Sequence, residues 1–229
     1  MNRYLAVLFA ALSLVSFNGA AQAATNWKEG QHYFRIQSMK RTTVPAGTVE
    51  VMEVFSYGCI ACNQFLPVAK RLESSLPKNA KMVYLPASFN PPEAWPMFQR
   101  AYLTAQALGI ADKTHDAMFE AVWKTGELGI VDQANRKLKR NLPTIEDAAR
   151  FYNKRTGVAV EKFVSTANSF SIEMKVKQAD ALVRAYQVEQ TPTLIVNGRY
   201  RINNQSLTSY DELIQLVNYL VGQESAATS

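Results

Sequence analysis

The chain has 229 residues, of which 25 are basic and 19 acidic, so its formal net charge is +6. Hydrophobic residues make up 48% of it, enough to bury a sizeable core without covalent cross-links. With only two cysteines, the composition excludes a small scaffold held together by disulfides, and the interspersed charges argue against a nucleic-acid-binding protein.

The first 23 residues have the pattern of a cleaved secretory signal. Arg3 supplies the positive start, residues 4–17 are apolar, and Ala21-Gln22-Ala23 fits a cleavage site made of small residues. The apolar run is shorter than the roughly 20 residues that a bilayer requires, so we predict cleavage rather than a membrane anchor. No later stretch is apolar enough to span a membrane. The one dense basic run, 136–140, is interpreted as a solvated helix face rather than a nucleic-acid or membrane patch.

The segment after the signal predicts a strand, a helix and a second strand. Residues 49–55 are rich in β-branched and apolar side chains, which favours a buried strand. Residues 60–76 repeat apolar side chains every three or four positions, the period of an amphipathic helix, and 81–88 again favour a strand. This order is typical of a parallel strand pair with a right-handed crossover.

Helical periods dominate the middle of the chain, and strands return near its end. We expect helices at 94–108, 112–124, 144–156 and 172–186, with N-caps at Asp112, Thr144 and Ser171 and stops at Gly109, Gly126 and Gly157. Strands at 193–197 and 199–202 are joined at Asn197-Gly198, a pair favoured in tight hairpins, and a helix follows at 209–221.

The predicted element order fits an α/β protein whose sheet domain is interrupted by an insertion. We assign residues 24–90 and 189–222 to the sheet domain and 91–188 to an all-helical insertion. The polar, small-residue tail 223–229 is predicted to be disordered.

Cys59-Ile60-Ala61-Cys62 begins where the first strand gives way to the helix. The thiolate is the reactive form of cysteine, and unpaired backbone N–H groups and the helix dipole at this position favour it. Cys62 falls one turn further on the same helix face, within reach of a disulfide. We predict that Cys59 is the attackable sulfur and Cys62 the shielded one.

Two other uses of the cysteine pair are weaker. A structural zinc site needs four ligands, and His32 and His115 are poorly spaced to complete one, so we expect no metal and no cofactor beyond the cysteines themselves. An inert disulfide closing a four-residue loop would stabilise the fold by only about 2 kcal/mol. A redox-active pair is the interpretation that remains.

Thr191-Pro192 stands before the predicted hairpin, and by sequence alone a trans proline opening an edge strand is the simpler interpretation. The order of strand, Cys-x-x-Cys, helix, Thr-Pro, hairpin and helix nevertheless resembles the thioredoxin superfamily. The residues from Glu53 to Cys62, Val-Asn-Gly-Arg-Tyr at 196–200, Glu-Gly-x-His-Tyr at 29–33 and the helical block resemble, more narrowly, the DsbA family of bacterial periplasmic disulfide oxidases. The resemblance covers essentially the whole mature chain.

This resemblance implies a thioredoxin-like fold and a periplasmic dithiol oxidase. Such a protein donates its disulfide to newly exported proteins with free cysteines, and a quinone-linked membrane oxidase of the DsbB type then reoxidises it. We expect a monomer. The resemblance also implies that Pro192 is cis and faces the cysteines. By sequence alone Glu53 is more simply an ordinary strand glutamate turned to solvent, whereas the resemblance implies a buried proton acceptor for Cys62. Substrate would contact the chain at Thr191, Pro192, Ile60, Ala61 and Tyr57.

The chain departs from the family pattern between its cysteines. Many relatives have Pro-His there, and the histidine favours the thiolate, whereas Ile60 and Ala61 offer neither a charge nor a side-chain donor. We therefore predict a less acidic Cys59 and a weaker oxidant than a Pro-His relative. Some relatives also place a lysine near the buried acid, where Tyr84 is the counterpart here.

Two alternative functions remain open from the sequence. One is a disulfide isomerase or reductase that is kept reduced in the same compartment. The other is a non-catalytic binding module that holds unfolded chains in a groove near Tyr57 and Pro192.

Overall fold

The computed structural model describes residues 26–37, 42–132 and 134–227. The predicted signal, 1–23, lies outside these residues. Within the described part of the chain, no helix is both long and apolar enough to cross a membrane.

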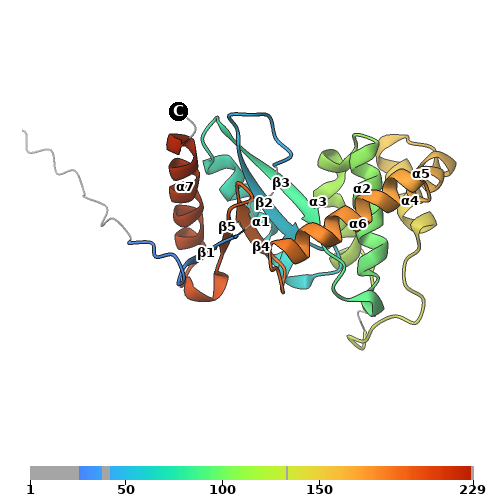
Figure 1. Ribbon diagram of the computed structural model, residues 1–229. Helices are drawn as coiled ribbons and strands as arrows, with labels where there is room; N and C mark the ends of the chain where they lie inside the picture. The colour runs from blue at the N-terminus through green and yellow to red at the C-terminus, as the bar shows by residue number, and fades with distance from the viewer. Residues whose placement is uncertain (1–25, 38–41, 133, 228–229) are drawn as a thin grey trace, which may run out of the picture.

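The core of the molecule is a five-stranded sheet with the strand order β1-β5-β4-β2-β3 (Figure 1). Its strands are β1 (Tyr33–Arg35), β2 (Val49–Phe55), β3 (Ala80–Pro86), β4 (Thr193–Val196) and β5 (Tyr200–Ile202). The neighbours β2 and β3 are parallel, and the other pairs are antiparallel. Every residue of β2 is buried, because the strand lies between two others and both of its faces are covered. The three-residue β1 was not predicted, being too short to show a period.

Successive residues of β2 point to opposite faces of the sheet and into different core clusters. Val49 and Val51 pack with α1 (Ile60–Ser75) and α7 (Tyr210–Ala227). Met52 and Val54 pack instead with the helical half of the chain. The expected strand, helix, strand unit is therefore confirmed, with α1 as its crossover.

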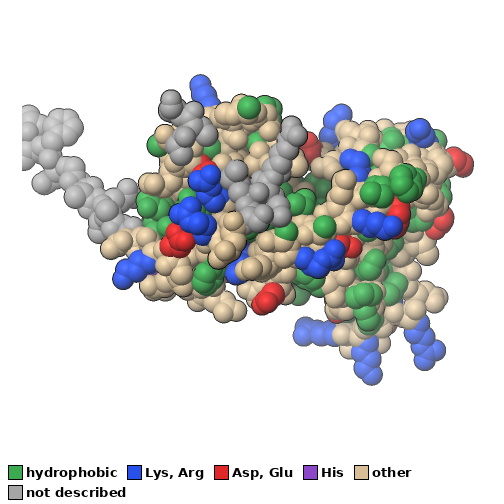
Figure 2. Space-filling model, in the orientation of Figure 1, with side chains coloured by type: hydrophobic (Ala, Val, Ile, Leu, Met, Phe, Trp, Pro, Cys, Tyr) green, Lys and Arg blue, Asp and Glu red, His purple; other side chains and the backbone are tan. Residues whose placement is uncertain are grey.

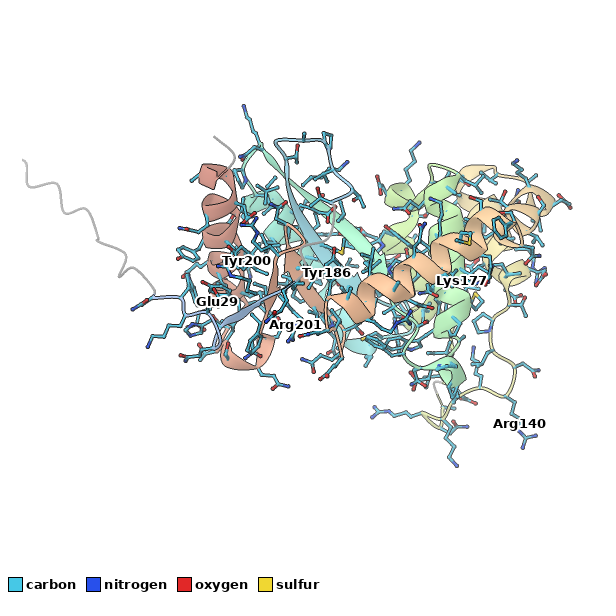
Figure 3. All side chains as sticks on the ribbon, viewed as in Figure 1. Glu29, Arg140, Lys177, Tyr186, Tyr200 and Arg201 are labelled. Atoms are coloured by element: carbon cyan, nitrogen blue, oxygen red, sulfur yellow. The ribbon has the colours of Figure 1, made fainter. Side chains whose placement is uncertain are left out.

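The helical half comprises five α-helices and lies beside β3 (Figure 1). They are α2 (Trp95–Ala107), α3 (Ala111–Trp123), α4 (Ile145–Thr156), α5 (Val160–Ala167) and α6 (Phe170–Ala185), and the short 3-10 helices η1 (Pro91–Glu93) and η2 (Asn204–Ser206) precede α2 and α7. From α5, α6 runs obliquely back to the start of β4 (Figure 1). The fully buried Tyr186 ends α6 where it meets the sheet (Figure 3).

Helix boundaries agree with the predicted caps in part. Thr144 caps α4 through a reciprocal capping box with Asp147, and Gly157 ends that helix with a φ of 75°. The cap of α6 is Ser169 rather than Ser171, because the Ser169 hydroxyl accepts the N–H of Ile172. Likewise Asp112 lies inside the first turn of α3 and does not cap it. The eight-residue α5 was missed.

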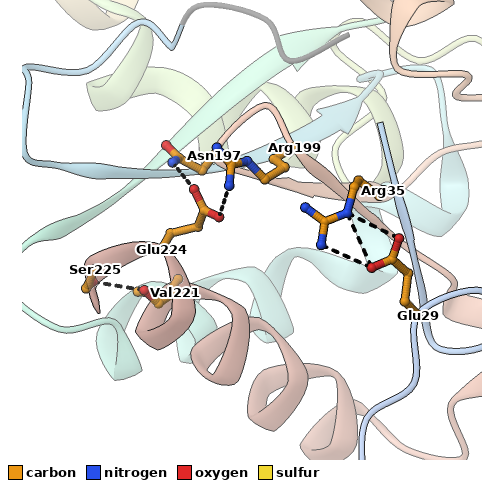
Figure 4. Close-up of polar contacts among 7 residues, drawn as sticks. All are labelled: Glu29, Arg35, Asn197, Arg199, Val221, Glu224 and Ser225. Atoms are coloured by element: carbon orange, nitrogen blue, oxygen red, sulfur yellow. Dashed lines mark hydrogen bonds and ion pairs between the residues drawn. The ribbon is translucent and has the colours of Figure 1, made fainter. Parts of the chain in front are cut away.

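Two further predictions are wrong. The basic run 136–140 is not on a helix: it belongs to the loop between α3 and α4, where Val131 and Leu138 form an isolated β-bridge. The tail was expected to be disordered from residue 223, but α7 continues to Ala227. The reason is long-range: the buried carboxylate of Glu224 accepts a hydrogen bond from Asn197 and pairs with Arg199 at the β4–β5 turn (Figure 4).

Candidate active site

Cys59 is the N-cap of α1, at the point where the chain leaves β2. Its extended backbone (φ −91°, ψ 114°) brings the sulfur over the first turn, where it accepts the backbone N–H of Cys62 at 3.3 Å. Cys59 is 8% exposed and Cys62 only 1%, and both are thiols here. The more accessible sulfur is therefore the one at the helix N-terminus, where a negative charge is favoured.

The two thiols have opposite electrostatic environments. Hydrogen bonding from the Cys62 thiol, assisted by the Thr191 side chain and by the backbone N–H groups of Cys62 and Ala61, lowers the pKa of Cys59 to about 6 despite partial burial. Burial raises the pKa of Cys62 well above its ordinary value, and its hydrogen bond to Cys59 adds to this. One proton is thus held on Cys62 while Cys59 is poised as a thiolate at neutral pH.

The Thr191–Pro192 segment faces Cys59, and its peptide bond is cis, as the family resemblance implies. The Thr191 carbonyl oxygen is 3.5 Å from the Cys59 sulfur and can accept the thiol proton. Behind it, the Asn204 side chain donates to the Pro192 carbonyl at 2.9 Å, which fixes the segment from η2. Two stretches 132 residues apart in sequence therefore meet at one sulfur.

A groove of about 440 Å³ opens beside the cysteine pair, between the start of α1 and the start of α7. Its walls come from three segments and include Ala61, Gln64, Phe65, Pro192, Asn204, Leu207 and Tyr210. Ile60 is not among them, but it is 48% exposed on the surface next to Cys59. Ala61, Pro192 and Ile60 are thus brought together around the reactive sulfur, on a surface that a peptide could reach.

Glu53 lies in β2 and is buried, which rules out the interpretation of an ordinary strand glutamate turned to solvent. It stands opposite Tyr84 on β3 and Leu194 on β4. Burial in this apolar setting, together with repulsion from the Cys59 thiolate, raises the pKa of the Glu53 carboxyl to about 8. Near neutral pH the carboxyl group holds a proton beneath the cysteines.

Tyr57 is not at the surface, so its predicted contact with substrate is corrected. The side chain is 1% exposed and its hydroxyl is 3.0 Å from Nδ1 of His115 on α3. Its backbone carbonyl accepts the indole N–H of Trp123 at 2.8 Å. Tyr57 holds the active-site loop against the helical half instead of lining the groove.

Three residues of the helical half contact this loop: Trp95, His115 and Trp123. Trp95 lies so close to Gly58 that a Cβ there would be 2.6 Å from its ring. Burial lowers the pKa of His115 to about 4, so this Tyr57 partner is neutral at physiological pH. Trp95, His115 and Trp123 are each separated from the active-site loop by dozens of residues in the sequence. No local sequence pattern could therefore have shown that they contact it.

The described residues contain no cluster of three or more histidine, cysteine or acidic side chains arranged to hold a metal ion. The chemistry that the site itself offers is that of two neighbouring thiols with unequal acidity.

Comparisons with known proteins agree with this geometry. The sequence pattern of the family described as Thioredoxin matches residues 44–216. The thiol:disulfide interchange protein DsbA of Pseudomonas aeruginosa is 34% identical over 96% of this chain and 97% of its own. Its crystal structure superposes with a TM-score of 0.73, covering 89% of this chain and 97% of that one. DsbA from Xylella fastidiosa has 30% identity and a TM-score of 0.74, covering 87% and 98% of the two chains.

The expected fold is therefore confirmed: it is thioredoxin-like, with helices inserted between the two parts of the sheet. Proteins of this class that carry a Cys-x-x-Cys pair at the start of α1 are thiol:disulfide oxidoreductases. The chain belongs to the DsbA family of thiol:disulfide interchange proteins.

Proposed function

We propose that this protein oxidises newly exported proteins in the periplasm by donating a Cys59–Cys62 disulfide to their free cysteines. The observation that carries the proposal is the placement of Cys59, which is the more exposed thiol, caps α1 and faces the cis-Pro192 segment. Stabilising the Cys59 thiolate stabilises the reduced protein, and so makes its disulfide a stronger oxidant.

The first step is attack of a substrate thiolate on the Cys59 sulfur. A bond forms between the substrate sulfur and Cys59, the Cys59–Cys62 bond breaks, and its electron pair leaves on Cys62. The cis-Pro192 segment and the groove beside Ala61 are suited to hold the substrate chain, with Thr191 offering backbone hydrogen bonds and Ile60 an exposed apolar contact.

A second substrate thiolate then attacks the substrate sulfur of the mixed disulfide. The substrate gains a disulfide and Cys59 leaves as a thiolate, so that two substrate thiols are oxidised and one protein disulfide is reduced. The lowered pKa of Cys59 makes it the better leaving group in this step.

Cys62 needs a proton when it leaves, because its burial disfavours the thiolate. Glu53 is the proposed source, since a carboxyl with a pKa of about 8 is protonated at neutral pH and lies beneath the pair. The same carboxylate would take the proton back when Cys62 is reoxidised. A membrane oxidase of the DsbB type, linked to quinones, is the proposed acceptor of the two electrons, and we propose that the protein acts as a monomer.

The test combines two variants with a reduced, unfolded test protein. Cys59→Ser should abolish its oxidation. Cys62→Ser, whose Cys59 is first converted to a mixed disulfide with glutathione, should exchange the glutathione for a test-protein thiol and form a mixed disulfide through Cys59. Continued disulfide formation by Cys59→Ser would defeat the oxidase proposal and leave the binding module. The resting redox state in cells separates the other alternative, because a disulfide isomerase or reductase must be kept reduced.

A further inference from the structure

A basic hairpin, whose described residues are 131, 132 and 134–140, projects from the loop between α3 and α4. Two backbone hydrogen bonds join its arms: the N–H of Asp132 donates to the Lys137 carbonyl at 2.8 Å, and that of Lys139 donates to the Ile130 carbonyl at 2.8 Å. The Asp132 carboxylate accepts the Ala134 N–H at 2.8 Å, which closes the turn. The buried Ile130 anchors the base of the hairpin in the core.

The hairpin presents a concentration of positive charge. Arg136, Lys137, Lys139 and Arg140 fall within five residues, and the sequence has no acid between Asp132 and Glu146. Three of the four side chains are exposed and that of Lys139 is half-buried. Figure 2 shows basic side chains projecting from this end of the helical half without acidic ones among them, and Figure 3 places Arg140 at its far corner.

Neighbouring acids do not neutralise this charge. Glu127 is paired with Arg155, and Asp132 is committed to the turn. Among the residues that the structure describes, none forms an ion pair with any of the four basic side chains of the hairpin. Leu138, in the middle of the run, is 43% exposed.

We propose that the basic hairpin binds the surface of an anionic phospholipid bilayer. Basic side chains near such a surface are attracted by its negative potential, and an exposed leucine among them can enter the headgroup layer. Each partner in a stable protein interface contributes roughly 20 residues, and this protrusion has only five. A protrusion of that size can still contact the flat surface of a bilayer.

The hairpin is also linked to the active site. Its loop begins one residue after Trp123, whose indole N–H is bonded to Tyr57, two residues before Cys59. Binding through the hairpin would hold the protein on the membrane surface where its oxidant resides. The segment that makes the contact is the one joined to the Cys59 loop through Trp123. That consequence rests on the proposed function, whereas membrane binding itself does not.

Co-sedimentation of the full mature protein with vesicles tests the proposal. We expect binding to phosphatidylcholine vesicles that contain phosphatidylglycerol, little binding to phosphatidylcholine alone, and release at high salt. The double variant Lys137→Gln/Arg140→Gln, which removes two exposed charges, should partition roughly 30-fold less, about fivefold for each charge removed. Its matched control is Lys78→Gln/Lys81→Gln, which removes two exposed charges near the start of β3 and should bind like the unaltered protein.

Equal partitioning onto the two kinds of vesicle, or equal binding by the hairpin variant and its control, would overturn the proposal. Hairpin-dependent capture by immobilised polyglutamate without vesicle binding would also overturn it and assign the loop to an acidic protein. Oxidation of a small dithiol peptide in solution is measured in parallel. Because the hairpin variant should retain it, loss of redox activity and loss of membrane binding are distinguished.

Discussion

At the scale of single residues, the low pKa of Cys59 does not depend on a histidine between the cysteines. The Cys62 thiol and two backbone N–H groups at the start of α1 point toward its sulfur. Ile60 and Ala61 contribute no side-chain donor, so the thiolate depends on the partner cysteine, on the Thr191 side chain and on the helix end.

Replacing Cys62 tests this dependence. Cys62→Ala removes the donor and should raise the pKa of Cys59 by about 1–2 units, since a hydrogen bond to a charged group is worth roughly 1.5–3 kcal/mol and each unit about 1.4. Cys62→Ser keeps a donor and should shift it less. The rate of iodoacetamide alkylation against pH gives both values; identical midpoints for the two variants would contradict the assignment.

Ala61→His tests whether the dipeptide tunes the oxidant. A histidine beside the sulfur favours the thiolate, so the variant should have a lower Cys59 pKa and a more oxidising equilibrium with glutathione. Ala61→Leu adds a side chain without a donor and serves as the control. If histidine and leucine leave both quantities alike, the prediction that Ile60-Ala61 weakens the oxidant is wrong.

Glu53 makes stability depend on pH in a known direction. Its pKa is raised in the fold, to about 8 from an ordinary 4.5. The unfolded chain can ionise above pH 4.5 while the folded carboxyl stays protonated, so the fold loses stability as the pH rises from 4.5 to 8. Glu53→Gln removes this loss. In urea unfolding of the reduced proteins, the free energy of unfolding of the variant should rise relative to that of the unaltered protein by about 1.4 kcal/mol per pH unit, a few kcal/mol over this range. A constant difference across that range would refute the shift.

At the scale of elements, the start of α1 is fixed by what packs against the turn before it. Gly58 has no side chain, and the ring of Trp95 at the start of α2 occupies the space that a Cβ would need. The helix that carries the cysteines is thereby held against the helix that begins the inserted half.

Gly58→Ala should therefore lower the free energy of unfolding. The loss comes from the added Cβ, since alanine favours ordinary backbone conformations. A Cβ 2.6 Å from the Trp95 ring and 3.2 Å from the Glu93 carbonyl forces a shift, with an expected loss of about 1–3 kcal/mol in urea unfolding. Trp95→Leu relieves the contact, so the double variant should cost less than the sum of the single ones. Strict additivity would show that the two positions do not press on each other.

At the scale of the whole molecule, the redox site and the ion pair of Glu224 lie in different parts of the fold. The ion pair of Glu224 joins the end of α7 to the β4–β5 turn (Figure 4), whereas Cys59 lies at the other end of the β2 strand, next to the helical half. The redox potential depends only on the difference in stability between the oxidised and reduced forms. A contact that is the same in both forms cannot change it.

Glu224→Ala should therefore destabilise both redox forms equally. The variant loses the hydrogen bond of the buried Glu224 carboxylate with Asn197 and its ion pair with the partly exposed Arg199, which should cost about 1.5–3 kcal/mol in urea unfolding of the oxidised and the reduced protein alike. The equilibrium with glutathione should stay unchanged. A shift in that equilibrium would mean that the Glu224 ion pair and the cysteine pair are energetically coupled.

The sequence by itself determined the features that depend on local pattern. The apolar run of β2, the period of α1, the capping box at Thr144 and the Asn197-Gly198 turn all express short-range preferences, and they placed Cys59 at the helix N-terminus. That position already identified a redox pair.

Tertiary structure alone decided what meets the pair and what does not. The cis-Pro192 segment reaches Cys59 across 132 residues, Tyr57 turns into the core toward His115, and Glu224 orders a tail that its composition marks as disordered. The basic run left its predicted helix for a projecting hairpin. Each outcome depends on contacts between distant segments, and such contacts leave no period in the sequence.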